Sequence, residues 1–186
     1  MIPFDMRPDA VMQELMSYGQ KLSHGVQNLM DVGEISAGVT PKTVVYQEDK
    51  LTLFRFNPPA DKVQSKVPLL IVYALVNRPY MADIQENRST VKALMDAGQD
   101  VYLVDWGYPD RADRYLTLDD YINGYLDRCV DVICERHRTD KINILGICQG
   151  GTFSLCYSAL HPEKVKNLVT MVTPVDFQTP DNMLSH

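Results

Sequence analysis

The chain has 186 residues, of which 45% are hydrophobic and 23% charged, so it can form a globular domain and is neither disordered nor fibrous in composition. Its 18 basic and 24 acidic residues give a formal net charge of −6 without any basic run, which argues against a nucleic-acid partner. The N-terminus lacks a signal-peptide pattern, and no apolar run nears the roughly 18 residues of a transmembrane helix, so we expect a cytosolic protein.

The first segment, residues 1–38, is predicted to form an amphipathic helix followed by a linker. Between Pro8 and Met30 the apolar residues recur every three or four positions, which is the spacing of a helix with one apolar face. Gly33 and Gly38 then interrupt the pattern. The apolar residues of this stretch are Val11, Leu15, Tyr18, Leu22, Val26 and Leu29.

A hairpin and the first strand–helix unit are predicted next. Residues 43–47 and 51–56 alternate apolar with polar around turn residues, which is typical of an edge hairpin, and the proline-bearing residues 57–66 indicate a surface loop. Residues 67–76 form a continuous apolar run, as in a central strand covered on both faces. Residues 83–97 have helical spacing and end at Gly98, so we expect a helix there.

The rest of the chain repeats the alternation of strand and helix. We predict strands at residues 100–107, 141–147 and 165–175, and helices at residues 118–137 and 149–161. Alternating units of this kind specify an α/β fold with a mostly parallel sheet and helices on both faces.

Cys148 lies at the junction between a predicted strand and a predicted helix. Gly146 and Gly150 flank it in a G-x-C-x-G pattern, the spacing of a nucleophile elbow, where the central residue is strained and its neighbours must be small. Such a turn lies at the carboxyl end of the sheet, where ligands bind, and next to a helix N-terminus, which favours the thiolate. The alternative is a small buried filler, but a core cysteine does not require the two glycines.

The other three cysteines are predicted to be packing residues inside helices, namely Cys129, Cys134 and Cys156. The four cysteines have neither C-x-x-C spacing nor histidine partners, so we expect no metal site and no disulfide framework.

Three stretches resemble the polyhydroxyalkanoate (PHA) synthases, and within them the class III catalytic subunit of the PhaC/PhaE type. They are "IVYALVNRPYMADIQ", "VYLVDWGYPDRADRYLTLDDY" and "INILGICQGGTFSLCYSALHPEKVKNLVTMVTPVDF". The resemblance covers essentially the whole chain and implies an α/β-hydrolase-like fold, with residues 39–186 forming an incomplete catalytic domain. In this family a cysteine replaces the serine of lipase-like elbows, and "GICQGG" is its signature.

The resemblance makes Cys148 the acyl-carrying nucleophile of a polymerase of 3-hydroxyacyl-coenzyme A, typically 3-hydroxybutyryl-CoA. It implies a cytoplasmic enzyme at the surface of PHA granules with a PhaE-type second subunit. No cofactor is expected, because coenzyme A is part of the substrate and a product. Sulfur suits this chemistry, since transfer from CoA to cysteine exchanges one thioester for another and keeps the acyl group activated.

Two backbone N–H groups are the expected oxyanion donors. In α/β-hydrolase folds they come from the residue after the nucleophile and from a loop after an earlier strand, which correspond here to Gln149 and, less securely, Val76. Asn77 and Arg78 are candidates for the CoA entrance, because arginine suits phosphate, although Arg78 equally suits a solvated loop.

No histidine offers a convincing catalytic base, although a thiol nucleophile needs a histidine oriented by a carboxylate. We expect His161 to interact with a helix C-terminus, and His24, His137 and His186 lie on the first helix, near the end of a later helix and at the last position. Asp105 is expected to cap a loop, and Asp176 follows the last strand without a histidine to orient.

The family carries its catalytic Asp and His farther along than the 38 residues that follow Cys148, so the chain resembles the N-terminal half of a synthase, truncated after the strand that follows the nucleophile helix. An open strand edge would favour self-association, poor solubility or low turnover. Three functions stay open at this point. They are an acyltransferase, a thiol hydrolase of polyester or thioester, and a noncatalytic fragment that binds a granule or a partner.

Overall fold

The computed structural model describes residues 8–31, 37–60, 64–176 and 178, and the chain divides into two compact units, Met1–Ser36 and Ala37–His186. The described part of the first unit is the long helix α1 (Pro8–Asp31), as the spacing of apolar residues predicts. None of the described helices is long and apolar enough to cross a bilayer.

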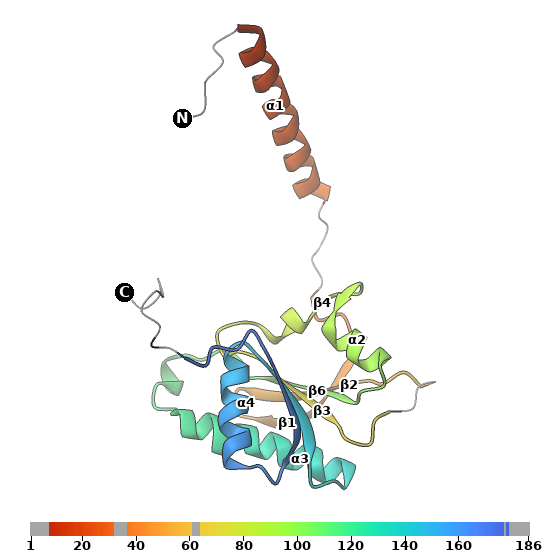
Figure 1. Ribbon diagram of the computed structural model, residues 1–186, viewed down its shortest axis with the longest axis vertical. Coiled ribbons are helices and arrows are strands. Elements are labelled where there is room, and N and C mark those ends of the chain that lie inside the picture. The colour runs from red at the N-terminus through yellow and green to blue at the C-terminus, as the bar shows by residue number, and fades with distance from the viewer. Residues whose placement is uncertain (1–7, 32–36, 61–63, 177, 179–186) are drawn as a thin grey trace. The chain divides into compact units, whose positions relative to one another are not determined.

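The second unit is built on a six-stranded sheet with the order β1-β2-β6-β3-β7-β8 (Figure 1). Strands β6, β3, β7 and β8 run parallel, and the β1–β2 hairpin adds to β6 in an antiparallel sense, so the predicted mostly parallel sheet is confirmed. The strands are β1 (Lys42–Glu48), β2 (Leu51–Phe56), β3 (Leu69–Val72), β6 (Val101–Asp105), β7 (Ile142–Ile147) and β8 (Val165–Met171).

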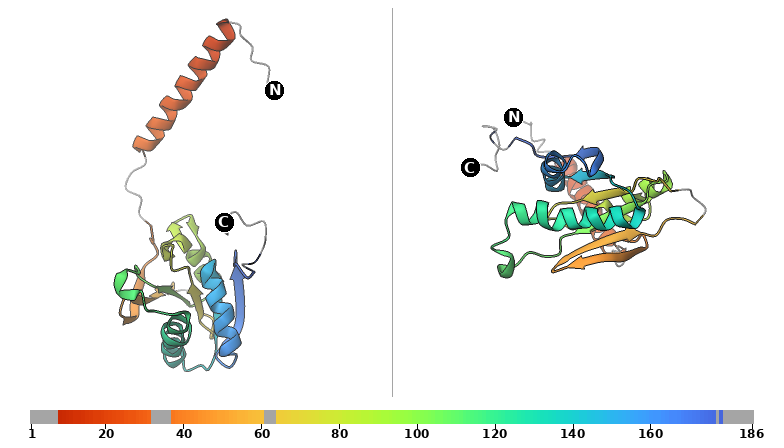
Figure 2. Two further views of the ribbon diagram at one scale, coloured as in Figure 1. Left: turned by 90° about the vertical axis from the view of Figure 1, so that its left-hand side faces the viewer. Right: turned by 90° about the horizontal axis from the view of Figure 1, so that it is seen from below.

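Helices cover both faces of this sheet, because the side chains of each central strand alternate between two apolar clusters (Figure 2). On β3, Leu70 and Val72 join one cluster, whereas Leu69 and Ile71 join the other. The first cluster is covered by η3 (Asp120–Leu126), α3 (Asp127–His137) and α4 (Gln149–Leu160), and the second by η1 (Pro79–Ala82) and α2 (Thr90–Asp96).

The helix predicted over residues 83–97 is wrong in its first half. Only α2 is helical there, and a small hairpin of β4 (Asp83–Gln85) and β5 (Arg88–Ser89) precedes it. The physical reason is Asp83, a buried carboxylate that accepts hydrogen bonds from Thr40 N, Thr40 Oγ1 and Ser89 Oγ. Ser89 also accepts from Lys92 N and so caps α2.

Two other predicted elements differ in extent or type. The strand expected over residues 67–76 is shorter, because the chain leaves the sheet after Val72. The predicted helix at residues 118–137 is present, but residues Asp120–Leu126 form a π-helix before the α-helix α3. A short 3₁₀ helix, η2 (Arg111–Asp113), precedes it.

Strand β8 forms the edge of the sheet and pairs only with β7 among the described residues. Val169 and Met171 are exposed on it, 55% and 44% respectively, and Val172 and Val175 beyond the strand are also exposed. The open apolar edge that the sequence predicts is therefore present.

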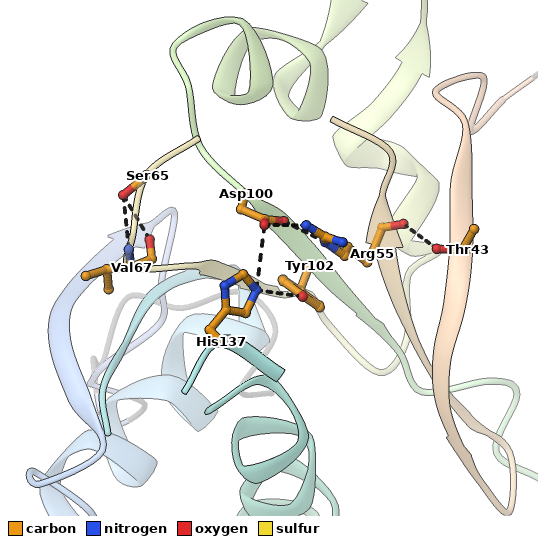
Figure 3. Close-up of polar contacts among 7 residues, drawn as sticks. All are labelled: Thr43, Arg55, Ser65, Val67, Asp100, Tyr102 and His137. Carbon is orange, nitrogen blue, oxygen red and sulfur yellow. Dashed lines mark hydrogen bonds and ion pairs between the residues drawn. The ribbon is translucent and has the colours of Figure 1, made fainter. Parts of the chain in front are cut away.

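A buried ionic cluster fixes the amino end of the central strands (Figure 3). Asp100, only 3% exposed, precedes β6 and accepts two hydrogen bonds from the Arg55 guanidinium of β2, at 2.9 and 2.6 Å. His137 Nε2 lies 3.6 Å from the same carboxylate and 2.8 Å from the Tyr102 hydroxyl. Burial lowers the pKa of His137 despite the neighbouring Asp100 carboxylate.

Substituting Arg55 with methionine should destabilise the domain, because it leaves the Asp100 carboxylate buried without its main partner. We expect a loss of about 2 kcal/mol, below the value for a fully buried pair because Arg55 remains partly exposed. Urea unfolding followed by tryptophan fluorescence measures it. Arg88→Met, an exposed position on β5, is the matched control and should change little. Equal stability of the two variants would contradict the role given to the Arg55–Asp100 pair.

Candidate active site

Cys148 forms the sharp turn between β7 and α4, at the carboxyl end of the parallel strands. Its φ of 56° and ψ of −128° are rare for a residue with a side chain. Two backbone hydrogen bonds hold this conformation, because Cys148 N donates to Met171 O of β8 and Gly151 N donates to Cys148 O, both at 2.9 Å. The structure thus has the bend that the G-x-C-x-G spacing predicts.

The flanking glycines are required by close packing. A Cβ on Gly146 would lie 2.5 Å from Gly151 Cα and 2.7 Å from Ser154 Oγ, and a Cβ on Gly150 would overlap the backbone carbonyl of Val72. In both cases the nearest atom belongs to the backbone of α4 or β3, so a change of side-chain rotamer cannot relieve the overlap. The small residues at these positions therefore allow helix, elbow and central strand to approach one another.

Gly151 is a third constrained position that the sequence reasoning missed. A Cβ there would overlap the side chain of Thr173, which follows β8. The neighbouring Thr152 hydroxyl donates to Pro174 O at 2.8 Å. The first turn of α4 is thus held against β3 on one side and against the segment after β8 on the other. The second of the two consecutive glycines after Cys148 was the sequence signal for this close contact.

The Cys148 side chain is partly buried and packs against the cluster of core residues on the α2 face. Tyr73, the residue after β3, packs against the same cluster. Burial and the nearby Cys148 together raise the pKa of the Tyr73 phenol. The thiol therefore lies at the edge of the core with an aromatic neighbour, and is neither buried in hydrocarbon nor fully in solvent.

The predicted oxyanion residues lie at the same edge of the sheet. Gln149 is the first residue of α4, and its side-chain Oε1 accepts a hydrogen bond from Leu75 N at 3.1 Å. That bond ties the loop after β3 to the elbow, a role for Gln149 that the sequence did not indicate. Val76 follows Leu75 and is 83% exposed. Donation by Gln149 N and Val76 N to an oxyanion stays a prediction.

The two residues considered for a CoA entrance follow Val76 on the same loop. Asn77 is exposed. The Arg78 guanidinium lies over the Tyr108 ring, 3.8 Å from its centroid, so it has an aromatic partner from the segment after β6. This cation–π contact orients the arginine at the carboxyl end of the sheet.

Within the second unit, the described histidines lie away from the elbow. His137 ends α3 and is hydrogen-bonded to Tyr102 within the Asp100 cluster. His161 caps the far end of α4 from Cys148, stacks on Tyr157 and lies 2.8 Å from Asn123 Oδ1. His24 belongs to α1, and His186 lies outside the described residues. Within the described part of the chain, no histidine is hydrogen-bonded to the Cys148 thiol.

The two aspartates singled out in the sequence accept local backbone hydrogen bonds. Asp105 Oδ1 accepts from Gly107 N at 3.0 Å, which is the loop cap that the sequence predicts. Asp176 is exposed and accepts from Gln178 N at 2.9 Å. Neither is paired with a histidine in the described structure.

The remaining cysteines lie in helices, as their sequence context predicts. Cys129 in α3 is fully buried, and burial raises its pKa to about 12. Burial also raises the pKa of Cys134 in the same helix, and Cys156 is partly buried in α4. No group of metal-binding side chains is present among the residues that the structure describes.

Comparison with protein families matches residues 67–186 to the alpha/beta hydrolase fold. The chain belongs to the α/β-hydrolase fold family. Residues 30–94 also match the N-terminus of poly-beta-hydroxybutyrate polymerase (PhaC). Both matches agree with the strand order and with the resemblance that the sequence stretches indicated.

Two curated relatives of high identity share one name. The chain is 66% identical over 186 residues to the poly(3-hydroxyalkanoate) polymerase subunit PhaC of Allochromatium vinosum, and 65% identical over 185 residues to that of Thiocystis violacea. Each alignment covers 100% of this chain and 52% of the relative. The chain thus spans about half the length of the curated relatives that it matches.

Solved α/β-hydrolase structures share the fold at low identity. A putative lipase from Sulfolobus solfataricus gives a TM-score of 0.58 at 18% identity, covering 76% of this chain and 47% of that chain. A probable hydrolytic enzyme from Pseudomonas aeruginosa gives 0.53 at 17% identity, covering 76% and 44%. At this identity the likeness establishes the fold alone.

Replacing Gly150 by alanine should disrupt the elbow, because the new methyl group overlaps the backbone of β3. We expect a loss of at least about 3 kcal/mol of stability, or failure to fold. Thermal melting followed by circular dichroism measures it. Gly124→Ala is the matched control, since a Cβ there meets only the flexible Arg128 side chain at 3.6 Å. A Gly150→Ala variant as stable as the control would show that the close approach to Val72 is unimportant.

Proposed function

We propose that this chain belongs to a poly(3-hydroxyalkanoate) polymerase and that Cys148 carries the acyl group as a thioester. The observation that carries the proposal is the placement of a cysteine at the elbow of an α/β-hydrolase fold, in a chain 65–66% identical to relatives named as polymerase subunits. The substrate class is a 3-hydroxyacyl-CoA, as the resemblance to the PHA synthases implies.

In the first step the Cys148 thiolate attacks the thioester carbonyl of the substrate. A new C–S bond forms, the C–S bond to coenzyme A breaks, and the CoA thiolate leaves. Because one thioester replaces another, the acyl group keeps its activation. In the second step the 3-hydroxyl of another acyl unit attacks, its proton passes to a base, an ester bond forms and the cysteine thiolate is released.

Backbone N–H groups would stabilise the tetrahedral intermediates of both steps. Gln149 N stands at the start of α4, where the helix dipole also favours negative charge. Val76 N would supply the second donor from the loop after β3. The hydrogen bond between Gln149 Oε1 and Leu75 N supports this assignment, because it holds that loop beside the elbow.

The base that removes the hydroxyl proton is not assigned to a described residue. His137 and His161 are engaged at other places in the fold, and the aspartates Asp105 and Asp176 make local hydrogen bonds. Thiolate attack on CoA thioester needs no base once the thiol is ionised. The first step thus requires only an ionised Cys148, whereas the second step also requires a base for the hydroxyl proton.

The proposed cellular location and partner subunit rest on the same family resemblance. We propose a cytoplasmic protein that works at the surface of a polyester granule, together with a second subunit of the PhaE type. We propose that Arg78 contacts phosphates of coenzyme A, and its position on the loop after Val76 and its contact with the Tyr108 ring support this proposal.

Incubating the chain with radiolabelled 3-hydroxybutyryl-CoA tests the proposal. The incubation is carried out at mildly alkaline pH, because the thiolate is the nucleophilic form of a cysteine. We expect the radiolabel to be bound to Cys148 as a thioester that hydroxylamine cleaves. In the Cys148→Ala variant the amount of protein-bound label should fall at least about 100-fold, because none of the other three cysteines occupies an elbow. Cys156→Ala, a partly buried cysteine on the same helix, is the control and should keep the label.

Other outcomes identify the other functions. If the Cys148→Ala variant still became acylated by the radiolabelled substrate, the acyl group would be bound to another residue, and the proposal would be overturned. Release of free 3-hydroxybutyrate without polymer would indicate a thiol hydrolase, and absence of any acyl-enzyme would leave a noncatalytic binding role.

A further inference from the structure

Helix α1 carries a stripe of large apolar side chains, and no other described element of its own unit packs against them. The exposed residues include Leu15 at 63%, Tyr18 at 69% and Leu22 at 62%. An amphipathic helix in water gains most of its stability by burying such a stripe against another element. Burial of this stripe against a partner would therefore stabilise α1.

The stripe follows a seven-residue repeat, which is typical of a helix that packs along another helix. Leucine recurs in the sequence at positions 15, 22 and 29, and glutamine recurs on the opposite side at positions 13, 20 and 27. With the leucines at heptad position a, Val11 and Tyr18 fall at d, Glu14 and Lys21 at g, and Met12 and Gly19 at e.

We propose that α1 pairs in antiparallel orientation with α1 of a second copy of this chain. In an antiparallel pair, position a of one helix packs against position d of the other. One register places Leu15 against Tyr18 of the second copy and Val11 against Leu22 of the second copy. By symmetry each layer occurs twice, so four apolar layers are formed within the described helix.

The flanking positions fit the same register. Position g then faces g, which brings Glu14 opposite Lys21 of the second copy, twice in the dimer. Position e faces e, which brings Met12, whose side chain is exposed within its own unit, opposite Gly19, where a methyl group added to the glycine would meet no atom within 4 Å. Opposite charges and a large side chain facing a small one favour this arrangement.

Other arrangements lack this complementarity. A parallel pair would place Glu14 beside Gly19 and Lys21 beside Val26, which leaves both charges unpaired. Shifting the antiparallel register by one heptad would bring Glu14 against Glu14 or Lys21 against Lys21. A membrane or granule surface is also a poorer fit, because α1 has one lysine, no arginine and three acidic residues, unlike basic interfacial helices.

Charge reversal tests the pairing in the whole chain. Glu14→Lys alone and Lys21→Glu alone should each raise the dimer dissociation constant about tenfold, since two attractive pairs become repulsive. The double variant Glu14→Lys with Lys21→Glu should restore it. Sedimentation velocity over a dilution series measures the constant. Gln13→Lys and Gln20→Glu, on the opposite side of the helix, are matched controls and should leave it unchanged.

Orientation is tested by disulfide cross-linking between copies. Leu15→Cys protein mixed with Tyr18→Cys protein should give cross-linked dimers, whereas each variant alone should give no more than the unsubstituted chain. Strong cross-linking of Leu15→Cys to itself would indicate a parallel pair and overturn the proposal. A chain that stays monomeric at all concentrations, or a dimer indifferent to both charge reversals and held by the β8 edge instead, would also overturn it.

Discussion

The second unit, Ala37–His186, depends on the close approach of the first turn of α4 to the end of β3. Gly150 touches the Val72 carbonyl region and Gly151 touches Thr173, so the helix start is wedged between the central strand and the segment after β8. This packing forces the strand–helix junction into a sharp bend, and Cys148 occupies it in a conformation that costs about 1–3 kcal/mol. Packing of the surrounding strands offsets that cost, and the result is a sulfur presented at the carboxyl edge of the sheet.

The two ends of the parallel strands have different tasks. At the amino end, Asp100, Arg55 and His137 form a buried polar cluster that links β2, β6 and α3. At the carboxyl end, Cys148, Gln149 and the loop after β3 meet around a partly exposed thiol. The polar cluster at one end therefore stabilises the scaffold, while the other end is the one at which open α/β sheets generally bind ligands.

Much of this arrangement could be predicted from the sequence, because the informative signals are local. The apolar runs of β6 and β7 and the glycines around Cys148 depend on neighbouring residues, and they predicted the sheet and the elbow. The failures involve contacts between distant residues. Helical spacing at residues 83–97 was overridden by the hydrogen bonds of the Asp83 carboxylate with Thr40 and Ser89, which favour a hairpin. The Gln149–Leu75 hydrogen bond and the Asp100 cluster likewise join segments far apart in the chain, so no local sequence pattern predicts them.

The central claim is that the fold presents one cysteine, Cys148, at an accessible turn and keeps Cys129 inside the core. Alkylation of the native chain by iodoacetamide at neutral pH, followed residue by residue with mass spectrometry, tests it directly. The account predicts that Cys148 is modified well before Cys129, whose thiol is fully buried. Modification of Cys148 no faster than Cys129 would mean that the sulfur at the elbow is enclosed, and would contradict the account.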